Sequence, residues 1–155
     1  EEADGEPDYS VDPQTVARVH AKIDRCLYWH GGLPFDRHQA KMKSGCEQTL
    51  TQVARVLKRH PALGLKILGY TGDLPKDQSE HLAQQRCQAI KHALVQMEVT
   101  NLIAIRGLGY VDSVGPRMEL IPCEPQEVST FLADLKNAER RACTGCNQLR
   151  MELIP

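Results

Sequence analysis

Segments with strand character alternate with segments of helical periodicity through the middle of the chain, and this alternation constrains the fold more than any other feature. Residues 65–68 and 101–106 are short apolar runs that predict strands, and residues 27–35 predict a short or broken strand. Residues 44–60 and 77–97 carry apolar side chains three and four positions apart, which predicts helices. The resulting order favours an α/β or α+β two-layer sandwich, with helices packed on one sheet.

Local signals indicate where these elements begin and end. Ser44 and Glu47 have the spacing of a capping box, as do Asp77 and Glu80, so each pair predicts a helix start. Gly69 is expected to break the strand that precedes it. The apolar faces expected to be buried consist of Leu50, Val53, Ala54 and Leu57 in the first helix and of Leu82, Ile90, Ala93, Leu94 and Met97 in the second.

Both ends of the chain extend this core. Asp12 followed by Pro13 predicts a helix start, because aspartate caps helices and proline suits their first turn. Pro125 opens another amphipathic pattern, which is expected to end at Arg140 and Arg141. The expected organisation is an acidic flexible segment over residues 1–11, a main domain over residues 12–122, and, within the same domain, a helix, a cysteine-bearing loop and a final strand over residues 123–155.

One hexapeptide, Arg-Met-Glu-Leu-Ile-Pro, occurs twice, at residues 117–122 and again at residues 150–155. Each copy predicts a short strand. Either the sheet gains two related strands, or one copy pairs in the core and the other lies outside it. Two copies are too few for a solenoid, which needs at least three repeats.

Composition excludes several classes of protein. The 155 residues carry a formal net charge of −1, which argues against a strongly basic nucleic-acid binder. Residues 1–12 hold six acidic side chains and no basic one, so the rest of the chain carries +5. The acidic head is expected to stay solvated, and the alternative is that it is a docking arm for a basic partner. No apolar run approaches the roughly 18 residues that a membrane-spanning helix needs. Because the chain starts at Glu1, we expect that a targeting segment has already been removed.

The sequence carries no pattern typical of an enzyme. Its histidines do not form the H-E-x-x-H pair of a metalloprotease, and no serine stands in a nucleophile elbow. No cysteine–histidine pair has the sequence context of a cysteine protease. We therefore expect a non-catalytic protein with no cofactor, apart from a zinc ion that the C-terminal cysteines are able to hold.

Cys143 and Cys146 form a C-x-x-C pattern that follows the C-terminal helix. A thioredoxin-like site instead lies between a strand and a helix, so a redox role has little support from this context. Together with Cys123 and one histidine, the two cysteines would supply the four ligands that a structural zinc site needs. Three roles stay open: a structural disulfide or free thiols in a loop, a zinc site, and redox chemistry.

A series of short motifs follows the order and spacing of a known domain. They are Phe35-Asp36, Leu50-x-x-Val-Ala54-x-x-Leu57-x-x-His-Pro61, Ile67-Leu-Gly-Tyr-Thr-Gly-Asp73, Leu82-Ala-Gln-Gln-Arg86-Cys-Gln-Ala-Ile90, Gly107-Leu-Gly109 and Asn147-Gln-Leu-Arg150-Met-Glu152. From Leu27 to Gly109, the chain resembles the OmpA-like domain, the C-terminal module that OmpA shares with MotB and Pal. A closing strand is expected at one of the two Arg-Met-Glu-Leu copies.

The resemblance implies a βαβαβ core and a candidate ligand site. Many members of the family bind the diaminopimelate peptide of peptidoglycan, with an arginine on the ligand's carboxylate and an aspartate on its amine. The arginine corresponds to Arg86, whereas Gly72 stands at the aspartate position and Asp73 follows one residue later. Thr71 and Ser79 complete the residues that the resemblance places at the site. The alternative role for Arg86 is a structural one, as a helix residue in an ion pair with Asp73, Asp77 or Glu80.

Three functional hypotheses follow from these observations. The first is a non-catalytic structural or accessory subunit, or binding module, of a membrane-associated complex, with a degenerate ligand site and protein partners. The second is a peptidoglycan anchor in which Asp73 and Arg86 grip the peptide. The third is a metal- or redox-responsive protein built on Cys123, Cys143 and Cys146. The resemblance implies a peripheral, membrane-associated location, in the periplasm or in an organelle.

Overall fold

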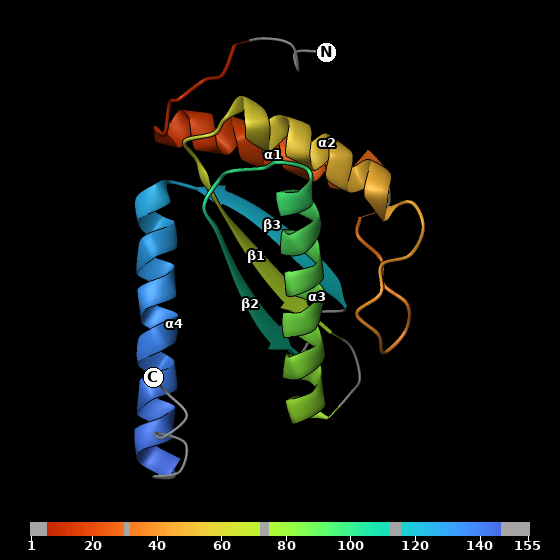
Figure 1. The fold of residues 1–155 in the computed structure, drawn as a ribbon, viewed down its shortest axis with the longest axis vertical. Coiled ribbons are helices and arrows are strands. Elements are labelled where there is room, and N and C mark those ends of the chain that lie inside the picture. Colours follow the sequence, from red (N-terminus) through yellow and green to blue (C-terminus); the bar gives the residue numbers. More distant parts are fainter. Residues whose placement is uncertain (1–5, 30–31, 72–74, 112–115, 147–155) are drawn as a thin grey trace.

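The computed structural model describes residues 6–29, 32–71, 75–111 and 116–146, and it consists of one three-stranded sheet with helices on both faces (Figure 1). Its helices are α1 (Pro13–Trp29), α2 (Cys46–Arg59), α3 (Lys76–Gln96) and α4 (Pro125–Cys146). Its strands are β1 (Gly64–Tyr70), β2 (Ile103–Gly109) and β3 (Arg117–Cys123).

The sheet has the strand order β2-β1-β3, with β1 parallel to β2 and antiparallel to β3. Leu65 of β1 lies opposite Ile103 on one side and opposite Pro122 on the other. The parallel pair is joined by α3, as a parallel connection requires a crossover. Pro122 has no N–H to donate, and it is tolerated because β3 is an edge strand among the described strands.

The main hydrophobic core lies between one face of the sheet and the helices α1, α2 and α3. The predicted apolar face of α2 is buried here, as are Ile90 and Leu94 of α3, whereas Ala93 and Met97 are only partly buried against this core. The largest fully buried side chains include Ile23 of α1, Leu50 and Leu57 of α2, Leu65 and Ile67 of β1, Ile90 and Leu94 of α3, and Leu120 of β3. This arrangement confirms the predicted sandwich of helices on one sheet.

The helix α4 adds a further layer on the opposite face of the sheet. Val128 and Phe131 pack there against Ala104 and Cys123. The contact is close, because a Cβ atom at Gly64 would lie 2.2 Å from the Cγ2 atom of Val128. In Figure 1, α4 runs along the sheet and extends beyond the ends of the strands. Among the described residues, no helix is long and apolar enough to cross a bilayer.

Gly69, which was expected to break the strand that precedes it, lies inside β1, so that expectation was wrong. The strand β1 continues through Gly69 to Tyr70, and β2 continues through Gly107 to Gly109. A Cβ atom at Gly107 would lie 2.3 Å from the backbone nitrogen of Gln84 in α3. Gly69 and Gly107 therefore allow α3 to approach the sheet closely, and the strands continue through them, with a register shift between Gly69 and Tyr70.

The predicted strand at residues 27–35 is also wrong. The helix α1 continues to Trp29, because Ile23 and Leu27 extend its apolar face by one more turn. Of the segment that follows, only Phe35 makes a strand-like contact, in an isolated bridge to Met42. The first strand of the predicted βαβαβ order is thus reduced to this bridge in the described residues.

Of the predicted helix starts, the one at Asp12 is confirmed and the two capping boxes are not. Asp12 does begin α1: its carboxylate accepts a hydrogen bond of 2.6 Å from the Thr15 hydroxyl, and its carbonyl accepts one from the Val16 N–H. The capping boxes are wrong, because Gly45 caps α2 with a φ of 101° and Pro75 caps α3. The observed cap of α2 therefore lies one residue after the predicted Ser44, and that of α3 lies two residues before the predicted Asp77.

The two ends of the chain also differ from expectation. The helix α4 continues through Cys146, so the C-x-x-C pattern lies in its last turns and not in a loop. No proline follows Pro125 within this helix to interrupt it. The acidic head is not solvated throughout, because the N–H of Asp8 donates to the carbonyl of Arg59 at 2.8 Å. The first copy of the repeated hexapeptide forms β3 as predicted, and the copy at residues 150–155 lies outside the described residues.

Candidate functional site

Arg86, the residue that the resemblance marks as a ligand for a carboxylate, lies on α3 and is only 7% exposed. Its Nε–H donates to the carbonyl of Gln39 at 2.9 Å, and its Nη2 donates to the carbonyl of Asp36 at 3.1 Å. The guanidinium also lies over the ring of Phe35, with 5.0 Å between Cζ and the ring centroid. Arg86 thus fixes the loop between α1 and α2 to the middle of the fold.

The loop that Arg86 holds is a tight turn with its own hydrogen bonds. The N–H of Asp36 donates to the carbonyl of Lys41 at 2.9 Å, and the N–H of Gln39 donates to the carbonyl of Asp36 at 3.0 Å. Burial lowers the pKa of Arg86, but an arginine side chain stays charged at neutral pH. A permanent cation therefore serves as donor to two backbone carbonyls, which are stronger interactions than neutral hydrogen bonds.

A cavity of about 520 Å³ lies beside Arg86. Arg37, Arg117 and Arg86 contribute its cationic groups, and its described lining includes no aspartate or glutamate. Apolar side chains, among them Phe35 and Leu82, form other parts of the wall. Arg117 lies over the Tyr70 ring at 5.3 Å and pairs with Glu119. The cavity combines apolar walls with positive charge, which suits an anionic ligand that has an apolar part.

The other residues predicted for this site occupy different positions. Thr71 lines the cavity, and its hydroxyl donates to the carbonyl of Ser79 at 3.1 Å. Ser79 is fully buried and is not among the residues that line the cavity. Asp73 lies outside the described residues, as does Gly72. The structure therefore brings Arg86 and Thr71 to one cavity, and the roles of Asp73 and Ser79 stay predictions.

No local pattern in the sequence indicates the partners of Arg86. Gln39 and Asp36 are 47 and 50 residues away from it along the chain. Phe35-Asp36 is one of the motifs that carry the resemblance, but this motif does not predict a contact with Arg86. The resemblance alone placed both segments in one domain, and only the fold shows that they meet.

The three C-terminal cysteines do not lie together in the described backbone. Cys123 is a free thiol at the end of β3, it is 2% exposed, and burial raises its pKa to about 11. Cys143 and Cys146 lie in the last turns of α4, which is about 30 Å from the start of that helix at 1.5 Å per residue. The zinc site that combines Cys123 with both of them stays a prediction, and the length of α4 does not favour it within a single chain. No group of three or more metal-binding side chains occurs among the described residues.

The sequence matches part of one curated protein. It is 36% identical over 77 residues to "Probable lipoprotein YiaD" of Escherichia coli (strain K12). The match covers 48% of this chain and 35% of that protein, so the chain spans about a third of its relative's length. No family model matches the sequence.

Several solved structures share the fold. The putative MotB-like protein of Desulfovibrio vulgaris gives a TM-score of 0.56 at 13% identity, over 72% of this chain and 92% of that one. The peptidoglycan-associated lipoprotein of Burkholderia pseudomallei gives 0.53 at 23% identity, over 58% and 87%. An outer membrane protein of Borrelia burgdorferi B31 gives 0.53 at 20% identity, over 57% and 81%. Likeness at such identities shows the fold, and the fold implied by the resemblance is therefore confirmed.

Proposed function

We propose, with the OmpA-like fold of this chain as the premise, that it is a non-catalytic module of a membrane-associated assembly whose ancestral ligand site has become a structural clamp. The observation that carries this proposal is the geometry of Arg86. Its Nε–H and Nη2 donate to the carbonyls of Gln39 and Asp36, and the side chain is buried. The arginine that would hold a carboxylate instead holds the chain's own loop.

The chemistry of the guanidinium explains why this matters for binding. The Nε–H and one N–H of Nη2 form one edge of the fork, which matches the two oxygens of a carboxylate. In this chain, two carbonyl oxygens occupy that edge. A carboxylate that bound there would displace both carbonyls and leave them to find other donors, which is costly for partly buried groups.

The relatives support the location. One bears the name of a probable lipoprotein, one is a peptidoglycan-associated lipoprotein, and one is MotB-like. These names support a peripheral, membrane-associated position for this chain in the periplasm, where it would belong to an assembly of proteins. Protein partners within such an assembly are then the expected ligands.

A second candidate function is a peptidoglycan anchor, and the cavity beside Arg86 favours it. The cavity holds about 520 Å³, and Arg37 and Arg117 add positive charge to its wall. A peptide carboxylate would find cationic partners there that Arg86 alone does not supply. If the chain is an anchor, the carboxylate would bind Nη1 of Arg86 together with Arg37 and Arg117, because the Nε–H and Nη2 edge is occupied by the two carbonyls.

Sedimentation with purified peptidoglycan sacculi separates the two candidates. The peptidoglycan-associated lipoprotein of Burkholderia pseudomallei serves as the positive control. The first proposal expects that this chain stays in the supernatant, because its arginine fork is occupied. Saturable pelleting of this chain would overturn the clamp proposal in favour of the anchor if Arg37→Ala and Arg117→Ala weaken it. The exposed variant Arg106→Ala is the control and should not weaken it.

A metal or redox role of Cys143 and Cys146 is a separate proposal, and it rests on the C-x-x-C pattern alone. Because α4 separates these residues from Cys123, a shared zinc ion would need ligands from elsewhere. Elemental analysis of the purified chain together with thiol counting tests this role. A chain without bound zinc whose two thiols do not change with redox conditions would remove it.

A further inference from the structure

A basic cluster where α1 meets the C-terminal end of α2 holds the acidic N-terminal segment. We propose that this cluster, formed by Arg18, Lys22, Arg59 and His60, is a binding site for an acidic peptide segment of a protein partner, and that the chain's own residues 6–12 occupy it in this structure. The inference is independent of the Arg86 cavity, because it concerns different elements and a different ligand.

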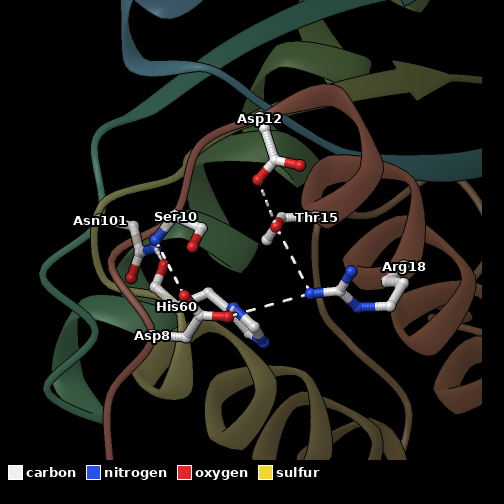
Figure 2. Close-up of polar contacts among 7 residues, drawn as sticks. All are labelled: Asp8, Ser10, Asp12, Thr15, Arg18, His60 and Asn101. Carbon is white, nitrogen blue, oxygen red and sulfur yellow. Dashed lines mark hydrogen bonds and ion pairs between the residues drawn. The ribbon is translucent and has the colours of Figure 1, made fainter.

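The geometry around Asp8 shows how an acidic segment fits this surface (Figure 2). The N–H of Asp8 donates to the carbonyl of Arg59 at 2.8 Å, which fixes the backbone of the segment. A carboxylate oxygen of Asp8 lies 3.9 Å from Nη2 of Arg18 and 3.9 Å from Nδ1 of His60. Its other oxygen accepts from the N–H of Ser10 at 2.9 Å. One carboxylate thus contacts two helices at once.

The side of the site formed by α2 is preorganised. His60 is 4% exposed, and its carbonyl accepts a hydrogen bond of 2.9 Å from the Nδ2 of Asn101, which also donates to the carbonyl of Leu63. Both ring nitrogens of His60 are buried and have no hydrogen-bond partner among the described residues. An unpartnered buried ring beside a carboxylate marks a place where a closer acidic ligand gains a hydrogen bond that Asp8 does not make.

The side formed by α1 is preorganised as well. The hydroxyl of Thr15 donates to Asp12, and it accepts from Nη2 of Arg18 at 3.4 Å. Asp12, Thr15 and Arg18 therefore form a chain of contacts along the first turns of α1, and Figure 2 shows that this chain ends beside Asp8. The guanidinium of Arg18 is thus directed by its own helix.

The charges do not balance at this site. Arg18, Lys22 and Arg59 all act on His60, whereas the N-terminal segment supplies two acidic groups, Asp8, which acts on His60, and Asp12, which acts on Arg18. The contacts of Asp8 are long for ion pairs, and its side chain is 35% exposed, so they are weak and reversible. A surplus of positive charge with a weakly held acidic segment suits exchange with a second acidic segment. The segment in the chain then acts as an internal competitor.

A peptide-binding experiment on the full chain tests this inference. The probe is a fluorescent synthetic peptide with the sequence of residues 1–12, and its binding is followed by fluorescence anisotropy at low ionic strength. We expect the Asp8→Ala chain to bind the peptide about fivefold more tightly than the unmodified chain, because the internal competitor is weakened. Adding Arg18→Gln to Asp8→Ala should abolish most of this gain.

The matched control is Asp24→Ala, which removes the same charge from an exposed position on α1, where Asp24 pairs with His20. This control should bind the peptide as weakly as the unmodified chain. If Asp8→Ala, and Asp8→Asn beside it, bind no more tightly than the unmodified chain, the inference is overturned. An equal gain in Asp24→Ala would also overturn it, since the effect would then follow net charge. Tight binding that persists when Arg18→Gln is added would overturn it as well.

Discussion

The Nε–H of Arg86 and the carbonyl of Gln39 are joined by a hydrogen bond of 2.9 Å, although 47 residues separate them in the chain. This bond attaches the loop between α1 and α2 to α3. It also removes the best donor edge of Arg86 from the cavity beside it. The same contact therefore stabilises the fold and limits what the cavity binds.

Replacing Arg86 by alanine should reduce the free energy of unfolding by about 3 kcal/mol. The variant loses two hydrogen bonds from a charged donor and the stacking of the guanidinium on Phe35. Urea unfolding followed by circular dichroism measures the change. The control is Arg106→Ala, which removes an exposed arginine from β2 and should stay within about 0.5 kcal/mol of the unmodified chain. Equal stability of both variants would contradict the clamp.

Stability should fall as the pH drops below about 6.5, because His60 is buried in its neutral form. Burial lowers the pKa of His60 in the folded chain, so between 6.5 and that lowered value the unfolded chain binds a proton that the folded chain does not. Hydrogen bonding with Ser10 and Thr15 lowers the pKa values of Asp8 and Asp12 from 3.8, and these carboxylates affect stability only at a more acidic pH.

Urea unfolding at about pH 7.5 and about pH 5.5 checks this prediction. The decrease should be smaller in His60→Gln than in the unmodified chain, and the exposed variant His92→Gln should retain it in full. A decrease of the same size in His60→Gln would show that other groups cause it.

Gly107→Ala should destabilise the fold by about 3 kcal/mol, because the new Cβ atom would lie 2.3 Å from the backbone nitrogen of Gln84. Backbone cannot rotate out of the way as the end of a side chain does, so α3 must move off the sheet. The hydrogen bond of 2.7 Å from the Gly107 N–H to the Gln84 side chain would be disturbed as well. Gly45→Ala is the comparison: its Cβ meets nothing within 4 Å, and only its φ of 101° costs about 1 kcal/mol. Thermal unfolding should rank the two variants in this order.

Cys87 and Cys123 should resist alkylation in the folded chain. Burial raises the pKa of Cys87 to about 12 and that of Cys123 to about 11, and the thiolate is the species that reacts. Mass spectrometry after brief treatment with iodoacetamide at about pH 8 should find both thiols unmodified, whereas the half-buried Cys26 reacts sooner. Rapid labelling of Cys123 without urea would mean that α4 leaves the sheet readily.

Helical periodicity was the part of the sequence that predicted structure best. The buried face of α2 and the stripe along α3 follow directly from the spacing of their apolar residues, because burial on one side of a helix leaves that pattern. The strand at residues 65–68 and the one at residues 101–106 were found for a similar reason, although their ends were wrong. Gly69 and Gly107 look like strand breakers in a single sequence, and only the approach of α3 shows why glycine stands there.

The candidate site was predictable only in part. The resemblance pointed to Arg86. No local pattern in the sequence predicts that its buried guanidinium donates hydrogen bonds to two carbonyls that are distant along the chain. The docking of Asp8 was missed for the opposite reason. The composition of an acidic head that contains glycine and proline predicts a solvated segment. The basic surface that receives it is formed by α1 together with the end of α2, and α2 is far along the chain from both the head and α1.

The most direct test of the clamp is the nuclear magnetic resonance signal of the Arg86 Nε–H in the ¹⁵N-labelled chain, followed during titration with a soluble diaminopimelate-containing peptide. The proposal predicts that this signal keeps its position up to about 10 mM peptide, where a site with a dissociation constant of about 1 mM would be mostly filled. A saturable shift of the Arg86 signal, accompanied by backbone amide shifts around the cavity that Arg86→Lys abolishes in a variant that remains folded, would contradict it and would establish Arg86 as a ligand-binding residue.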